Sequence, residues 1–306
     1  MRVAVLTGGV GGAKFVLGLS HCAEITALTA VVNTGDDFRH LGLPVSPDID
    51  TLLYTLSGRA NVAQGWGREG ESWSFLAALA SLGGPDWFRL GDGDLALHVL
   101  RGARLAAGEP LSAITAEFAR AWGIAARVLP MTDDPVATWL DTDEGPLPFQ
   151  DYFVARRCEP VVRRVRFEGA ASARPGPGVI AAIEAAEAVF VAPSNPFLSV
   201  DPILSVPGIA DALRAAGAPI VAISPLVGGT AVKGPTAKLM DELGLAADNE
   251  AIAAHYAGLL TGLLHDVSDH PPAALPARAA ATLMTTLDDK LRVARAALAF
   301  AADLAR

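Results

Sequence analysis

The first fourteen residues, MRVAVLTGGVGGAK, place a short apolar run directly before a cluster of glycines, and this pairing restricts the possible folds more than any other segment. Residues 3–6 are all apolar and do not alternate with polar residues, as expected of a parallel strand covered on both faces. Four glycines follow within residues 8–12, and apolar residues then recur at helical spacing from Ala13 to Cys22. The segment predicts a strand, a glycine turn and a helix in direct succession.

The alternation of strand and helix recurs along the chain. Thr29–Asn33 (TAVVN) is a second strand candidate, and two strands joined by a helix form a right-handed βαβ unit. Later, strands are predicted over 189–193 and 220–224, with a helix over 209–216 between them. This pattern predicts the α/β class with a Rossmann-like, doubly wound, mainly parallel sheet.

The remaining segments indicate how one domain is built around that sheet. With 306 residues, of which 51% are hydrophobic, the chain can bury a large core. We expect a single domain over 1–306, with a Rossmann-like core over about 1–60 and 180–265. A largely helical insertion with a small β meander is predicted over about 61–179, and C-terminal helices over about 266–306.

Charge, cysteine content and hydropathy exclude several classes of protein. The net charge is −9 and no cluster of Lys or Arg forms a cationic face, so we expect no nucleic-acid partner. Cys22 and Cys158 are far apart and show no zinc or redox spacing, which is typical of a reducing compartment. No apolar run reaches the roughly 18 to 20 residues of a membrane-spanning helix, and the N-terminus is not a secretory signal. A cytoplasmic protein without membrane contact is expected.

The glycine turn is a candidate anion site. Glycine lets the backbone approach an anion closely, and the N-terminus of the next helix adds N–H donors and a favourable dipole. Lys14 could add a positive charge there. A Rossmann fingerprint would need a third glycine at position 14, and a Walker loop would need Ser or Thr after the lysine, where Phe15 stands. A purely structural tight turn remains the alternative.

Four carboxylates lie close together in the sequence, at Asp36, Asp37, Asp48 and Asp50. The first two follow the second predicted strand, at the edge where open α/β sheets bind ligands. In an extended segment Asp48 and Asp50 would share one side, whereas in a helix they would diverge. Oxygen ligands beside a phosphate site suit Mg²⁺, with Asp50 as the first choice. Alternatively, Asp36 and Asp48 cap the helices that follow.

Two small, stiff turns follow the later strands. Residues 193–196 (PSNP) and 224–229 (SPLVGG) stand at predicted strand ends, so they should face the same crevice as the glycine turn. Lys233 and Lys238 follow the second turn. Loop chemistry alone is the alternative explanation for these residues.

A middle segment, WFRLGDGDLALHVLR, is less specific. Arg89, Asp92 and Asp94 flank a glycine turn, and His98 and Arg101 follow on a predicted helix. A single histidine on a helix is more often packed or exposed than catalytic, and no two histidines have metal-ligand spacing.

The ordered blocks together resemble the 2-phospho-L-lactate transferase family (CofD, called FbiA in mycobacteria). The resemblance extends from residue 1 to about 260 and rests on eight blocks: GGVGGAK, VVNTGDD, SPDIDTLLY, LGDGDLALH, LPMTDD, FQDYFV, PSNPFLSVDPIL and SPLVGGTAVKGP. It implies a Rossmann-like fold and a step in the synthesis of the deazaflavin coenzyme F420.

The resemblance also implies a reaction. Such enzymes transfer a phospho-three-carbon acid from its guanosine diphosphate conjugate to the ribityl hydroxyl of the deazaflavin FO, releasing GMP, and require Mg²⁺. The acid is 2-phospholactate in archaea, and phosphoenolpyruvate or 3-phosphoglycerate in bacteria. A guanylyltransferase is the expected functional partner and a homodimer the expected assembly. The alternatives are a non-catalytic, nucleotide-sugar-binding regulator of the same fold and a nicotinamide dehydrogenase.

Site residues are expected as follows. By resemblance, Asp50 and Arg89 match positions of the FO site, to which we add Asp92, and Asp50 is the expected catalytic residue. Mg²⁺ is expected on Asp50 with Asp48 or Asp37, so Asp50 is either a metal ligand or the group that receives the hydroxyl proton. The candidates for nucleotide and phosphate binding are Thr7, Gly9, Gly11, Gly12, Lys14, Asn33, Ser194, Asn195 and Pro196. Asp50→Ala is expected to abolish turnover without unfolding the protein.

Overall fold

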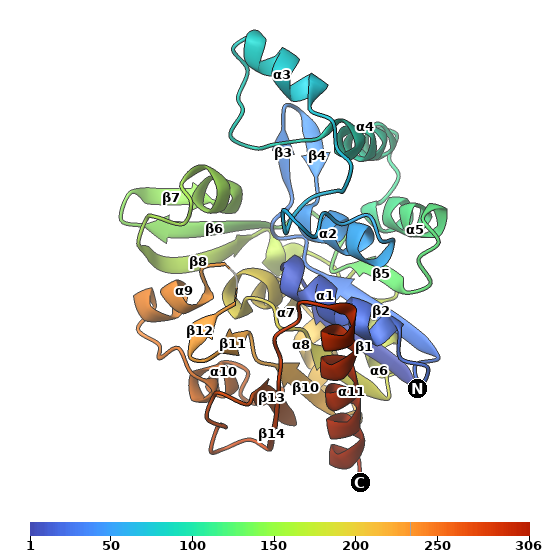
Figure 1. Cartoon of the computed structure of the whole chain (residues 1–306), viewed down its shortest axis with the longest axis vertical. Helices are drawn as coiled ribbons and strands as arrows, with labels where there is room; N and C mark the ends of the chain where they lie inside the picture. Colours follow the sequence, from blue (N-terminus) through green and yellow to red (C-terminus); the bar gives the residue numbers. More distant parts are fainter. Residues whose placement is uncertain (233) are drawn as a thin grey trace.

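A computed structural model describes residues 1–232 and 234–306, and its centre is a sheet of seven parallel strands (Figure 1). The order across the sheet is β14-β13-β10-β9-β1-β2-β5. The strands are β1 (Arg2–Thr7), β2 (Ala27–Val32), β5 (Arg127–Pro130), β9 (Ala188–Val191), β10 (Ile220–Ile223), β13 (Gly262–Asp266) and β14 (Ala277–Ala280). The chain winds outward from β1 in both directions, so the prediction of a Rossmann-like, doubly wound sheet is confirmed.

The register of the central strands determines where the loops meet. Thr7, at the end of β1, lies opposite Val32 at the end of β2, and Leu6 lies opposite Val191 at the end of β9. The strand order reverses between β1 and β9. The turns after these strands therefore meet at a topological switch point, where open α/β sheets bind ligands.

Both faces of the sheet are covered, because successive side chains of β1 point to opposite sides. Val3 and Val5 pack into one buried cluster, and Ala4 and Leu6 into the other. The first cluster contains side chains of α1 (Gly9–Ser20), α2 (Pro47–Leu56), α5 (Leu111–Ala121) and α11 (Leu287–Leu304). The second contains side chains of α6 (Val179–Glu184), α7 (Asp201–Ser205), α8 (Ile209–Ala215), α9 (Thr236–Glu242) and α10 (Asn249–His255).

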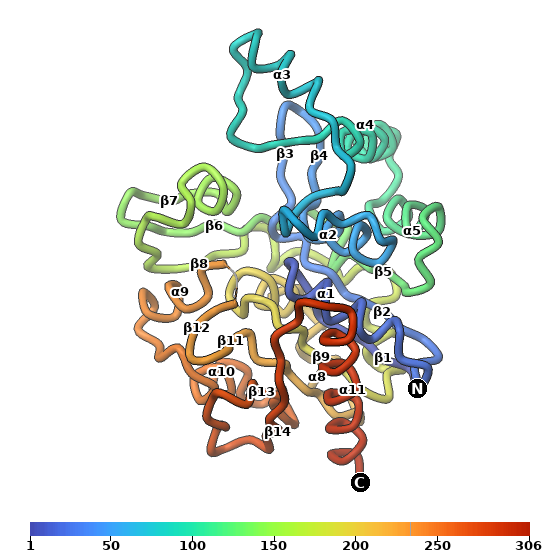
Figure 2. Tube along the Cα trace, viewed as in Figure 1, coloured from blue at the N-terminus to red at the C-terminus, as the bar shows by residue number. Residues whose placement is uncertain are grey.

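Helices α1 and α11 lie side by side although they come from opposite ends of the chain (Figure 2). Gly18 makes this approach possible, because a Cβ there would lie 2.3 Å from the Lys290 carbonyl oxygen. The C-terminal helix thus packs directly on α1, the helix that follows the glycine turn. No helix among the described residues has both the length and the apolar character needed to cross a membrane.

The segment between β2 and β5 extends away from the sheet. The hairpin β3 (Phe38–His40) and β4 (Leu43–Val45), and helix α3 (Ser74–Ser81), stand at one end of the molecule (Figure 1). Helix α4 (Asp92–Ala106) lies between α3 and α5 in the chain. The helical part of the insertion is confirmed by these elements.

A separate three-stranded antiparallel sheet follows β5. It contains β6 (Ala137–Thr142), β7 (Gly145–Pro148) and β8 (Val162–Glu168), in the order β7-β6-β8. Because β6 is central, this sheet is not the simple meander that was predicted. The remaining short elements are the helices η1 (Asp151–Ala155), η2 (Ala170–Ser172) and η3 (Pro196–Val200), and the hairpin β11 (Leu226–Val227) and β12 (Thr230–Ala231).

Two predicted boundaries need correction. The insertion over 61–179 is interrupted, because β5 returns to the main sheet beside β2. The region 266–306 contains β14 and one helix, α11, instead of helices alone. Alanine favours helix locally, but pairing of β14 with β13 overrides this preference at the sheet edge.

Candidate functional site

A cavity of about 760 Å³ opens at the carboxyl ends of the central strands. Loops after β1, β9 and β10 contribute to its lining, and α2 and α4 supply acidic and basic side chains. Representative lining residues are Gly9, Gly11, Ser194, Ser224, Asp48 and His98. The cavity therefore lies at the switch point between β1 and β9.

The glycine turn approaches the neighbouring loop too closely for side chains. A Cβ on Gly11 would lie 2.7 Å from the Pro193 carbonyl oxygen, and one on Gly12 would lie 2.2 Å from Thr7 Oγ1. Gly9, Gly11 and Lys14 line the cavity, so the turn is placed as predicted. Thr7 and Gly12 pack behind it. The first residues of α1 therefore offer an anion-binding position at the cavity.

Lys14 also reaches the C-terminal part of the chain, because its Nζ donates to the Met284 carbonyl oxygen at 2.9 Å. This contact holds the ammonium group at the cavity beside the start of α1. Lys233, the other lysine predicted near this region, lies outside the described residues. Lys238 does not line the cavity; its Nζ donates to the Pro160 carbonyl oxygen at 2.8 Å.

The turn after β9 is joined to the glycine turn by hydrogen bonds. Ser194 Oγ donates to the Gly8 carbonyl oxygen at 2.7 Å. Asn195 Oδ1 accepts from the backbone N–H groups of Phe197 and Leu198 and so caps η3, which begins at Pro196. Among residues 1–232 and 234–306, Asn195 Nδ2 has no hydrogen-bond partner, although it is buried and the residue lines the cavity. This amide is a donor available to a ligand. Pro196 is buried and does not line the cavity.

Asn33 does not line the cavity but fixes a residue that does. Its Nδ2 donates to Asp48 Oδ2 at 3.0 Å, and its Oδ1 accepts from the Gly35 N–H at 2.7 Å. The other oxygen of Asp48 accepts from the Gly9 N–H at 2.7 Å. Asp48 thus occupies one N–H donor of the glycine turn, and Asn33 holds it there.

The two carboxylates of the SPDID segment diverge, because Pro47–Leu56 is a helix and not an extended segment. Asp48 points to α1, whereas Asp50 points to α4. The local signal was present in the sequence, since Ser46 and Pro47 occupy the N-cap and first helical positions. The alternative capping role is also corrected: Asp48 accepts from the first residue of α1 and does not cap α2, whose N-cap is Ser46.

Three of the four carboxylates are held in an unfavourable environment. Burial raises the pKa values of Asp36 and Asp37 well above the usual range of an aspartate, and nearby carboxylates raise them further. Burial also raises the pKa of Asp48, to about 6. Asp36 Oδ1 and Asp37 Oδ1 are buried and have no hydrogen-bond partner in the described part of the chain, although Asp37 Oδ2 accepts from Ser46 Oγ at 2.6 Å. The positive charge of Arg101 lowers the pKa of Asp37, but the effect of burial is larger.

The raised pKa of Asp48 predicts that its contribution to stability falls with rising pH. A carboxyl group with a raised folded-state pKa stabilises the fold below its ordinary value of 3.8, and this contribution is lost as the pH rises through about 6. Relative to the unsubstituted protein, the free energy of unfolding of Asp48→Asn should therefore rise by about 2 kcal/mol between pH 4 and pH 7. Urea unfolding of both proteins across this range measures the gain, and a constant difference would contradict it.

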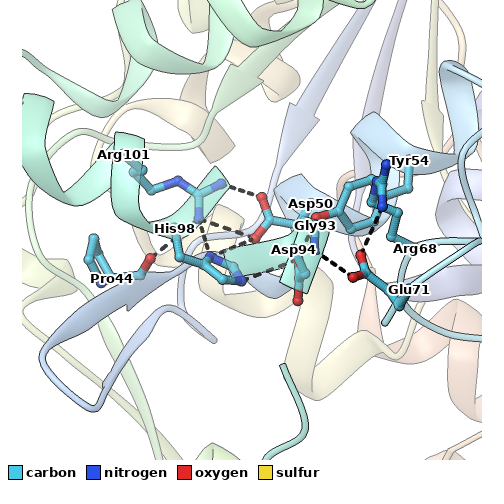
Figure 3. A network of polar contacts seen from close by, with 9 residues as sticks. All are labelled: Pro44, Asp50, Tyr54, Arg68, Glu71, Gly93, Asp94, His98 and Arg101. Atoms are coloured by element: carbon cyan, nitrogen blue, oxygen red, sulfur yellow. Dashed lines mark hydrogen bonds and ion pairs between the residues drawn. The ribbon is translucent and has the colours of Figure 1, made fainter. Parts of the chain in front are cut away.

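Asp50 has a different partner from its neighbours. Its Oδ2 accepts from Arg101 Nη1 at 3.1 Å, and its Oδ1 accepts from Arg101 Nη2 (Figure 3). Arg101 is only 1% exposed, so the pair is a buried, bidentate ion pair. An arginine thus neutralises the carboxylate that was expected to be the first ligand of Mg²⁺.

The structure separates the other two residues expected at the FO site. Arg89 lines the cavity, and its guanidinium carbon lies 4.5 Å from the centre of the Trp73 ring. Asp92 does not line the cavity. Its carboxylate accepts from Ser72 Oγ at 2.6 Å and from the Phe75 N–H at 3.0 Å, which stabilises the start of α3.

Residues that the sequence left unassigned complete the site. Asp94 and His98 on α4 line the cavity together with Tyr54 on α2. Aromatic side chains also contribute: Trp87 and Phe88 pack with a ring-centre distance of 5.7 Å, and Phe149 and Phe153 stack at 5.2 Å. The segment WFRL, which contains Trp87 and Phe88, was a visible signal for this aromatic part.

No group of three His, Cys, Asp or Glu side chains in the described ranges, 1–232 and 234–306, is arranged to hold a metal ion. The predicted set of Asp50, Asp48 and Asp37 is therefore not assembled as a cage. Mg²⁺ commonly binds one or two protein carboxylates together with substrate phosphates. The unpartnered oxygen of Asp36, beside the ionisable Asp48, fits that kind of site.

Comparison with known proteins extends these observations. Residues 3–300 match the family model described as 2-phospho-L-lactate transferase CofD. A phosphoenolpyruvate transferase of Streptomyces coelicolor is 42% identical, and the alignment covers 99% of each chain. A phosphoenolpyruvate transferase of Mycolicibacterium smegmatis is 37% identical, with 97% of this chain and 98% of the relative covered.

Among solved structures, a member of the UPF0052 family from Bacillus halodurans is similar with a TM-score of 0.65. It is 18% identical, and the match covers 97% of this chain and 99% of that chain, so it supports the fold alone. The family model and the curated relatives confirm the resemblance found in the eight sequence blocks. The chain belongs to the CofD family and is a transferase.

Proposed function

We propose that this protein transfers the phosphoenolpyruvyl group from its guanosine diphosphate conjugate to the ribityl hydroxyl of the deazaflavin FO, in the synthesis of coenzyme F420. GMP is released and the product is dehydro-F420-0. The names of the curated relatives favour phosphoenolpyruvate over 2-phospholactate and 3-phosphoglycerate as the acid. The observation that carries the proposal is that an anion-binding turn, buried carboxylates and aromatic side chains line one cavity.

The donor fits the polar part of this cavity. Phosphate oxygens can accept from the N–H groups at the start of α1 and from the unpartnered Asn195 Nδ2, with Lys14 as a counter-charge. The acceptor fits the aromatic part, because a flat tricyclic ring stacks well on aromatic faces such as those of Trp87 and Phe88.

The reaction is a direct displacement. The ribityl hydroxyl oxygen attacks the phosphorus that bears the enolpyruvyl group and forms a new P–O bond. The bond from that phosphorus to the bridging oxygen breaks, and GMP leaves with the electron pair. Asp50 receives the hydroxyl proton, since it lines the cavity and Arg101 holds its orientation. Positioning and charge neutralisation supply most of the rate in such reactions.

Mg²⁺ belongs to this proposal as a bound cofactor. Asp48 and Asp36 would hold it together with donor phosphates, since both line the cavity and neither forms an ion pair with a cationic side chain of residues 1–232 and 234–306. When bound, Mg²⁺ polarises phosphoryl oxygens and offsets their charge. A guanylyltransferase must supply the donor from GTP and the acid, and a homodimer is proposed from the family resemblance alone.

A coupled assay tests the function. The purified protein is incubated with FO, Mg²⁺, GTP, a guanylyltransferase and one of the three acids, and products are identified by mass spectrometry. We expect dehydro-F420-0 and GMP in equal amounts when phosphoenolpyruvate is supplied. No F420-0-type product with any of the acids would overturn the proposal. Tight binding of a nucleotide sugar without turnover would then favour a non-catalytic regulator. Binding of a nicotinamide nucleotide would instead favour a dehydrogenase.

A further inference from the structure

Two helices present matching polar faces behind the catalytic carboxylate. On α4, Asp94, His98 and Arg101 are spaced by four and three residues and share one face. On α2, Asp50 and Tyr54 are four residues apart. Figure 3 shows the five side chains pointing toward one another as a continuous network.

His98 occupies the middle of this network. Its Nδ1 lies 3.3 Å from Arg101 Nη1 and 3.8 Å from Asp50 Oδ2, and its Nε2 lies 3.2 Å from Asp94 Oδ1. The imidazole is 1% exposed. It therefore touches both the arginine that binds Asp50 and a second carboxylate on its own helix.

The contact with Arg101 determines the tautomer of His98. A guanidinium group carries five N–H donors and no acceptor, so Nδ1 must accept from Arg101. The ring hydrogen then lies on Nε2, which faces Asp94. Burial alone would raise the pKa of Asp94, but the contacts with His98 and Tyr54 lower it below its usual value. Asp94 is consequently ionised; it accepts a hydrogen bond from the Tyr54 hydroxyl and lies at ion-pair distance, 3.2 Å, from His98 Nε2.

Arg101 needs this support because its other contacts leave it incompletely fixed. Nη1 is shared between Asp50, His98 and the Pro44 carbonyl oxygen, the last at 3.4 Å. Nε is buried and has no hydrogen-bond partner among the residues that the structure describes. Removing the His98 acceptor would let the guanidinium rotate toward the remaining oxygens. The orientation of the Asp50 carboxylate would change with it.

We propose that His98 is a positioning residue that fixes Arg101 and, through Arg101, orients the Asp50 carboxylate toward the acceptor hydroxyl. The catalytic consequence rests on the proposed function, in which Asp50 receives the hydroxyl proton. In this role His98, although it lines the cavity, acts on Arg101 and not on the donor or the acceptor. Asp94 lies on the opposite side of the imidazole, 3.2 Å from Nε2.

Kinetics of two His98 variants test the role. His98→Phe keeps a ring but removes the acceptor, and we expect kcat to fall about 30- to 100-fold with an unchanged KM for the donor. His98→Asn retains an acceptor for Arg101, and its kcat should stay within about 5-fold of the original. A control, His255→Phe, removes a partly buried histidine that contacts a carboxylate outside the cavity, and kcat should not change. Equal losses in the Phe and Asn variants would overturn the proposal.

The route through Arg101 is tested by combining substitutions. Arg101→Lys keeps the charge but loses the bidentate contact with Asp50. If His98 acts through Arg101, adding His98→Phe to Arg101→Lys should lower kcat by less than about 3-fold. A full additional loss in the double variant would show that His98 acts independently and would overturn the proposal.

A spectroscopic measurement tests the network without turnover. Nitrogen chemical shifts of labelled histidine distinguish protonated from unprotonated ring nitrogens, and the His98→Asn spectrum assigns His98 among the six histidines. We expect a bare Nδ1 and a protonated Nε2 near pH 7. A protonated Nδ1 would overturn the positioning role even in an active enzyme. If the protein shows the expected tautomer but has no transferase activity, the proposed function is contradicted and the contact between His98 and Arg101 is not.

Discussion

Asp50→Ala is expected to lower the free energy of unfolding by about 3–5 kcal/mol and to abolish turnover. Both oxygens of Asp50 accept from Arg101, and Arg101 is buried, so the substitution leaves an arginine charge without its partner inside the protein. The sequence alone predicted an unchanged fold, because Asp50 was grouped with three other carboxylates. Because Arg101 on α4 pairs with Asp50, we expect the substitution to destabilise the fold. The expected loss of turnover is unchanged.

A double variant separates the two effects. Asp50→Ala combined with Arg101→Met removes both charges, so most of the lost stability should return, by at least about 2 kcal/mol, while turnover stays absent. Asp211→Ala is the matched control, because it breaks an ion pair between Asp211 and Arg214 at the surface. The Asp211 side chain is 79% exposed, so the free energy of unfolding should change by less than about 1 kcal/mol. Urea unfolding and the coupled assay provide both measurements. Full stability of the single Asp50→Ala variant would contradict the buried-pair argument.

Local signals in the sequence predicted the ligand-binding edge of the fold well. The apolar run and glycines at residues 3–12 predicted β1, the turn and α1, and the turn at residues 193–196 was assigned to the same crevice. These features depend on short-range chemistry, namely glycine conformations and strand ends. The rule that parallel strands bring their carboxyl ends together then places them side by side.

Long-range pairings could not be derived in the same way. Arg101 is 51 residues from Asp50, and the partner of a carboxylate at that separation depends on how α4 packs on α2. The short strands β5 and β14 were missed for a related reason, because each has four residues and gains its order from the neighbouring strand. The helix over Asp48 and Asp50 was different. Its capping signal was local, and it was overlooked.

Removal of divalent cations is expected to lower turnover by about 1,000-fold or more. The donor brings phosphate and carboxylate charge to a cavity whose own carboxylates Asp36, Asp48 and Asp50 are balanced by few cations. Neutralising a transferring phosphoryl group is worth several kcal/mol, and each 1.4 kcal/mol is about tenfold in rate. Dialysis against EDTA, followed by titration with Mg²⁺ in the coupled assay, measures the effect. Undiminished turnover in excess EDTA would contradict it.

Two comparisons locate the cation. Asp48→Asn should raise the Mg²⁺ concentration for half-maximal activity at least about 10-fold, whereas the exposed control Asp211→Asn should leave it unchanged. The Mg²⁺ requirement should also rise below about pH 6, because Asp48 with its raised pKa is then protonated and is a poor ligand. Since Asp50 is already paired with Arg101, its charge does not have to be offset by the metal. If the Mg²⁺ requirement of Asp48→Asn is unchanged, Asp48 is not a ligand of the metal. Asp36 is then the carboxylate to test.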